Sequence, residues 1–204
     1  YNLLELAFIE GKNASLFSFY NILPLLKVKK KRGNFKKYIN KFYHKKYIKN
    51  KIIKYISENS NEIYFTNSHG DFASYNLLKT NKNYYIFDFE KFSHTSLYYD
   101  QINFISHLLF YNFSKFTILL KHNVIQRFLI TCFNYFIIKF VFFLFIKVMK
   151  YENLSFVQFK NYFFLYLLTK ISSLRKDLES NLNKKEKLIV KQSIITMDKI
   201  LINI

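Results

Sequence analysis

Apolar residues at intervals of three and four positions predict an amphipathic helix over residues 35–56. Lysines fill many of the intervening positions, so the helix would have one apolar face and one charged face. The apolar positions are Phe35, Tyr38, Ile39, Phe42, Tyr43, Tyr47, Ile48, Ile52, Ile53 and Ile56. We expect the apolar face to pack on a core and the lysine-rich face, which includes His44, to be solvated.

Shorter runs predict strands and loops around this helix. Residues 3–10, LLELAFIE, are typical of a strand that ends in a turn at Gly11, and residues 27–34, KVKKKRGN, predict a basic loop. After the helix, the run IYFTNSHGD predicts a strand that ends near Gly70. NLL and YYIFDF then predict two short strands, and the polar turn KTNKN between them predicts a β-hairpin.

The chain changes character at Tyr98 and predicts helices from there onward. Ser155 with Gln158, and Asn183 with Glu186, have the spacing of capping boxes and predict two helix starts. Together with the strands upstream, these helices predict an α+β fold.

The aromatic-rich runs in this part of the chain predict helices of the core. FFLFI and YFFLY are apolar enough to need burial. The first lies in the apolar stretch from Cys132 to Lys150, which Lys139 and Lys147 interrupt. A membrane span needs roughly 20 mostly apolar residues, so we interpret the stretch as a buried helix with Cys132 as a core thiol.

The charge of the chain is strongly positive, with 32 Lys and Arg residues against 13 Asp and Glu and a net charge of +19 over 204 residues. Such a charge attracts nucleic acids and anionic membranes. The only arginines are Arg32, Arg127 and Arg175, and nucleic-acid recognition favours arginine, so we expect no nucleic-acid partner. Codon bias toward Lys, Asn, Ile, Phe and Tyr is the alternative source of the charge, and peripheral contact with an anionic membrane surface stays open. The lone cysteine and the lack of a signal-like start predict a cytoplasmic protein.

The stretch from Ser68 to Phe92, SHGDFASYNLLKTNKNYYIFDFEKF, concentrates Asp, Asn and Gly in a chain otherwise poor in acids and glycines. The predicted hairpin would bring Asn76 and Asp88 side by side at its open end. A carboxylate and an amide oxygen suit Mg²⁺, which takes one or two protein ligands and leaves the rest to phosphate and water. Asp71, just before this pair, would accept a proton from an attacking hydroxyl, as phosphoryl transfer requires.

The spacing of HGDFASYN followed by YIFDFE resembles the signature of the aminoglycoside phosphotransferase and choline kinase superfamily, which has a protein-kinase-like fold. The resemblance implies a mostly helical C-terminal lobe in which a short hairpin carries the catalytic and metal-binding loops. It implies Asp71 as catalytic base and Asn76 and Asp88 as Mg²⁺ ligands. It implies that His69 supports the catalytic loop and that Asp100 braces this loop from the following helix. We expect Glu90 either to assist a second cation or to support the site through hydrogen bonds.

The first residues resemble the strand that joins the two lobes of that family. The resemblance implies that backbone groups of Ala7 and Ile9 contact the adenine of ATP. It divides the chain into a hinge strand at 1–12 and a helical lobe at 13–204, with the catalytic segment at 66–92. The family's N-terminal lobe, with its phosphate-covering loop and lysine, is absent from the sequence. We therefore expect a fragment of a longer kinase, or else an inactive remnant.

These observations predict an ATP- and Mg²⁺-dependent phosphotransferase acting on a small hydroxylated molecule, with a sugar or amino sugar favoured. Cationic aminoglycosides need an acidic pocket, which a chain with so few acids disfavours. The alternative is an inactive, pseudokinase-like binding module with a basic surface that faces a membrane or nucleic acid. We expect His94 to lie on a surface loop, and His107 and His122 to lie on helices far from the motif.

Overall fold

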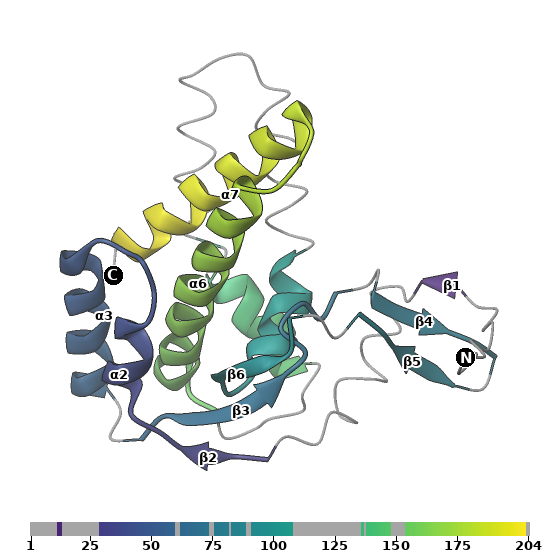
Figure 1. Ribbon diagram of the computed structural model, residues 1–204. Coiled ribbons are helices and arrows are strands. Elements are labelled where there is room, and N and C mark those ends of the chain that lie inside the picture. The colour runs from purple at the N-terminus through teal and green to yellow at the C-terminus, as the bar shows by residue number, and fades with distance from the viewer. Residues whose placement is uncertain are drawn as a thin grey trace, which may run out of the picture.

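The computed structural model describes residues 12–13, 29–59, 62–73, 76–81, 83–88, 91–107, 136, 138–147 and 154–202. In these parts the protein combines helices with two small antiparallel sheets, so the predicted α+β class is confirmed. The helices and one sheet form the main body, and the other sheet projects from it on the right of Figure 1.

The sheet of the main body has the strand order β2-β3-β6. Its strands are β2 (Lys31–Arg32), β3 (Tyr64–Ser68) and β6 (Ser93–Ser96). The prediction of β3 is confirmed. The basic loop predicted over residues 27–34 is wrong at Lys31 and Arg32, because both residues pair with β3. The sequence did not predict β6, whose polar run SHTS lacks apolar alternation and becomes a strand by pairing with β3.

The projecting sheet has the order β1-β4-β5 and contains the predicted hairpin. It consists of β1 (Lys12–Asn13), β4 (Leu77–Lys79) and β5 (Tyr84–Ile86). Leu77 pairs with Ile86, and the turn is closed by a hydrogen bond from the Thr80 backbone N–H to the Asn83 carbonyl at 2.9 Å. The hairpin is confirmed, and its open end faces the main body (Figure 1).

The helix predicted over residues 35–56 is two helices, α2 (Phe35–Asn40) and α3 (Lys46–Asn59). Two carbonyls between them accept hydrogen bonds from side chains. Lys49 donates to the carbonyl of Phe42 at 3.0 Å, and Arg175 donates to the carbonyl of Tyr43 at 2.9 Å. Because these carbonyls have other donors, the helix can end at Asn40 and restart at Lys46 without leaving them unsatisfied.

The histidine in this break is not solvated, so that prediction is wrong. The His44 side chain is only 1% exposed, and its Nε2 lies 2.8 Å from Oδ1 of Asp198. Asp198 also contacts Arg175, at 3.3 Å. The segment between α2 and α3 is thus fastened to the two C-terminal helices.

Those helices are α6 (Phe156–Leu178) and α7 (Lys184–Ile202). Both predicted capping boxes are present. Ser155 accepts from the backbone of Gln158 while Gln158 accepts from the backbone of Ser155, and Asn183 and Glu186 exchange the same pair of bonds. Residues 99–107 and 138–147 are also helical, so helices dominate the described part of the chain after Tyr98.

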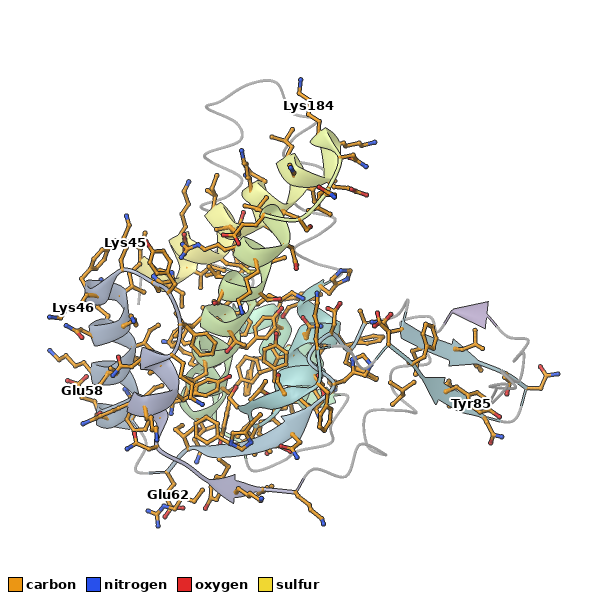
Figure 2. The ribbon with its side chains drawn as sticks, viewed as in Figure 1. Lys45, Lys46, Glu58, Glu62, Tyr85 and Lys184 are labelled. Atoms are coloured by element: carbon orange, nitrogen blue, oxygen red, sulfur yellow. The ribbon has the colours of Figure 1, made fainter. Side chains whose placement is uncertain are left out.

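The core is centred on α6, whose run YFFLY at 162–166 is buried as predicted. Residues Ile48, Ile52 and Ile56 of α3 pack in the same cluster. The run FFLFI is buried at Phe145, but Phe143 is 55% exposed, so the core prediction holds there only in part. In Figure 2 the labelled side chains Lys45, Lys46, Glu58 and Lys184 point outward from the helices. Of the described helices, none is both long and apolar enough to cross a bilayer.

Candidate functional site

The HGD loop, residues 69–73, follows the last residue of β3 and depends on a glycine. Gly70 has a φ of +84°, which L side chains rarely adopt. A Cβ at this position would overlap the backbone carbonyl of Lys91. Glycine therefore allows the loop to pass directly against the backbone of the segment that follows the hairpin.

Asp100, near the start of the helix at 99–107, holds the HGD loop from the core side. Its Oδ2 accepts the backbone N–H of His69 at 2.7 Å, and its Oδ1 accepts the backbone N–H of Gly70 at 3.0 Å. Burial raises the pKa of the Asp100 carboxyl, and the two N–H donors act in the opposite direction. Both oxygens of one carboxylate are thus used to fix the backbone of the loop.

His69 connects the HGD loop to the end of β5. Its Nε2 lies 2.7 Å from the carbonyl of Phe87, and its Nδ1 lies 3.4 Å from the backbone nitrogen of Asp71. A carbonyl only accepts and a backbone N–H only donates, so this pair of contacts fits the neutral tautomer with the proton on Nε2. The imidazole is therefore an internal link between the loop and the hairpin.

Asn76 and Asp88 lie at the same open end of the hairpin. The Asn76 carbonyl accepts the backbone N–H of Phe87 at 3.2 Å, which places the residue before Asp88 opposite Asn76. The side chain of Asn76 is buried, and its amide donates to the Asp71 carbonyl at 3.0 Å. Asp88 is exposed and has a φ of +62°, a conformation that non-glycine residues adopt infrequently and that is enriched at functional sites.

These two residues fit the Mg²⁺ that the sequence resemblance implies. The amide nitrogen of Asn76 is occupied by the Asp71 carbonyl, so the amide oxygen is the atom left to bind a cation. The Asn76 amide oxygen and the exposed Asp88 carboxylate, at the same end of the hairpin, are both hard oxygen ligands of the kind that suits Mg²⁺ completed by phosphate and water. Within the described residues, no group of three His, Cys, Asp or Glu side chains gathers in a way that could hold a metal ion. Glu90, Ala7 and Ile9, the other predicted site residues, lie outside the described part of the chain, as does His122.

The carboxylate of Asp71 faces two lysines that the sequence analysis did not identify. Nζ of Lys170, on α6, lies 3.2 Å from Oδ1, and Nζ of Lys91 lies 3.6 Å from Oδ2. Lys91 also lies 3.8 Å from a carboxylate oxygen of Asp177. Asp71 and Lys170 are only 9% and 7% exposed. Burial lowers the pKa of Lys170, while the charge of Asp71 acts to raise it.

Asp71 lines a cavity of about 290 Å³ that also touches both C-terminal helices, here called the α6–α7 cavity. Lys91, Lys170 and Asp177 line it together with His107. Burial, followed by the charge of Lys170, lowers the pKa of His107 to about 4, so the imidazole is neutral at pH 7. The expectation that His107 lies far from the motif is wrong, because His107 and Asp71 line the same cavity. His94 is exposed as predicted, but on β6 instead of a loop, where its ring stacks on Phe65.

The sequence contained one signal for Lys170. It is a charged residue two positions after the long apolar run 162–168 of α6, and a lysine in such a position needs a partner when it is buried. Nothing in the local pattern identified Asp71 as that partner.

The comparisons with known proteins assign no family to this arrangement. No family model matches the chain, and neither the curated proteins nor the solved structures contain a match.

Proposed function

We propose that the protein is an ATP- and Mg²⁺-dependent phosphotransferase of kinase-like fold that phosphorylates a hydroxyl group of a small molecule, with a sugar or amino sugar as the favoured acceptor. The observation that carries the proposal is the linkage of the HGD loop to the hairpin end. Asn76 donates to the carbonyl of Asp71, and Asp88 follows the residue opposite Asn76. A base and a pair of oxygen ligands are therefore held by one hydrogen-bonded unit.

In this proposal each residue of that unit has one task. Asp71 accepts the proton of the acceptor hydroxyl, since its carboxylate borders the α6–α7 cavity. Asn76 and Asp88 would hold Mg²⁺. The cation would neutralise the negative charge of the phosphoryl group that ATP donates. Asp100 and His69 keep the loop in place through its backbone. Lys170 orients the Asp71 carboxylate from α6.

Two matched variants of the native protein test the proposal. Asp71→Asn removes the base and should lower kcat about 10²–10⁴-fold, while the affinity for Mg²⁺-ATP stays within about twofold. Asp88→Asn removes a metal ligand and should weaken Mg²⁺-dependent ATP binding in a thermal-shift assay. Glu58→Gln, on the exposed face of α3, is the control and should change neither quantity. An Asp71→Asn variant with full turnover would exclude Asp71 as the base.

One observation favours the second candidate, an inactive binding module with a lysine-rich surface. Both oxygens of Asp71 already face an ammonium group, so an acceptor hydroxyl would have to compete with Lys91 and Lys170 for this carboxylate. This candidate predicts no Mg²⁺-dependent shift on adding ATP. It predicts instead salt-sensitive binding to vesicles that contain anionic lipid.

A further inference from the structure

We infer that the α6–α7 cavity takes an uncharged acceptor, which presents one hydroxyl to Asp71 and an apolar substituent to α7. The inference rests on the proposed phosphotransferase function and names the class of its acceptor. Two features of the cavity carry it, the pairing of its charges and the composition of its far wall.

Four of the five charged groups that line the cavity pair with one another. Asp71 faces Lys170 and Lys91, and Asp177 faces Lys91. The third carboxylate, Glu186, accepts the backbone N–H of Asn183 at 3.0 Å at the start of α7. At the Asp71 end of the cavity a charged acceptor would have to break one of these pairs or enter without a partner, which costs free energy in a partly buried site.

The remaining titratable group on the wall adds no charge. His107 is neutral at pH 7 because burial lowers its pKa to about 4. A hydroxyl, which can donate to a carboxylate without displacing an ammonium group, is the ligand group that this lining accepts most readily.

The far wall of the cavity is mostly apolar. It is formed by Leu174 of α6, by Leu182 in the connection between the helices, and by Ile189, Val190 and Met197 of α7. Two polar residues of α7, Glu186 and Ser193, also lie on it, and the Ser193 hydroxyl donates to the Ile189 carbonyl. Leu174 and Val190 are only partly buried, so an apolar substituent placed there would remove exposed hydrocarbon from water. The volume of about 290 Å³ is at the small end of ligand pockets, which suits one sugar-sized ring with a short substituent.

Binding of simple glycosides to the native protein, measured by calorimetry without ATP or Mg²⁺, tests this inference. Butyl β-glucoside should bind at least about tenfold more tightly than methyl β-glucoside, because each buried CH₂ adds to the affinity. It should also bind at least about tenfold more tightly than butyl β-glucuronide, an anion, and a butyl glycoside of glucosamine, a cation. Equal binding of the charged and neutral glycosides, or no gain from the butyl group, would overturn the inference.

Variants of the apolar wall locate the binding. Val190→Asn should reduce the affinity for butyl β-glucoside toward that for the methyl compound, and Leu174→Gln, on the other helix, should do the same if the first variant folds poorly. Ile195→Asn is the matched control, since Ile195 lies on α7 outside the cavity and is exposed. A loss of affinity in Ile195→Asn equal to that in Val190→Asn would contradict binding at this wall.

The binding assay is independent of catalysis, so the two proposals can fail separately. The expected glycoside preferences without any phosphate transfer to butyl β-glucoside would keep the ligand class and contradict the proposed activity. ATP-dependent phosphorylation of a charged acceptor in preference to a neutral one would keep the activity and overturn the ligand class.

Discussion

Replacing Lys170 by Met should destabilise the protein strongly, because the substitution leaves a buried carboxylate with less compensation. Nζ of Lys170 and Oδ1 of Asp71 are 3.2 Å apart, and both side chains are mostly buried. At an effective dielectric constant of about 20 the attraction between two such charges is about 5 kcal/mol. The variant loses this attraction, but the Asp71 carboxylate is still compensated in part by Lys91, which lies 3.6 Å from its other oxygen. We therefore expect a loss of about 3 kcal/mol in the free energy of unfolding, within the range for a broken buried pair.

Urea denaturation followed by circular dichroism measures this loss, and a thermal scan should show a decrease in Tm of roughly 6–12 °C for a chain of this size. Lys91→Met is the matched control. Its side chain is 42% exposed, so its pair with Asp71 is screened by solvent and the variant should lose less than about 1 kcal/mol.

The double variant Lys170→Met with Asp71→Asn sharpens the test. It removes both charges together, so it should be more stable than the sum of the two single losses predicts, by about 2 kcal/mol. If Lys170→Met costs no more than Lys91→Met, and the two single losses simply add, the claim that Lys170 compensates a buried carboxylate is wrong.

Three further perturbations address other parts of the site and fold. Gly70→Ala should cost at least about 2 kcal/mol in urea denaturation, because the new Cβ meets the Lys91 carbonyl at a positive φ; a loss under 0.5 kcal/mol, on the order of a neutral surface change, would contradict the close approach. The unfolded chain binds a proton at His107 near pH 6.5 and the folded protein only near pH 4, so stability should fall by roughly 3 kcal/mol as the pH drops through this interval. His107→Gln should lose that part of the pH dependence, and parallel curves for the two proteins would refute the assignment. Ser155→Ala should lower stability by about 1 kcal/mol through the capping box with Gln158, and an unchanged midpoint would show that the cap contributes nothing.

The HGD loop and the hairpin were predictable because the signals that specify them are local. A glycine before Asp71, two short apolar runs and a polar turn are enough to predict the strand β3, the hairpin of β4 and β5, and the approach of Asn76 to Phe87. The capping box at Ser155 is local in the same sense. The class of fold follows from such local patterns added along the chain.

The partners of Asp71 were not predictable, because they come from distant positions. Lys170 lies 99 residues away in the sequence, and its ammonium reaches Asp71 only after α6 has packed against the sheet. The break between α2 and α3 has the same origin, since Arg175 binds the Tyr43 carbonyl from 132 residues away. Periodicity predicts which face of a helix is apolar, but it carries no information on tertiary hydrogen bonds that interrupt the helix.

The short connection between α6 and α7 has a consequence for how this protein can change. Residues 156–202 supply most of the apolar wall as one stretch, whereas Asp71 and the hairpin end with Asn76 and Asp88 come from residues 66–92. A segment exchange or a small insertion in that connection would remodel the wall in a single genetic event. The lining of the cavity would then change while the sequence of the HGD loop and the hairpin stays the same.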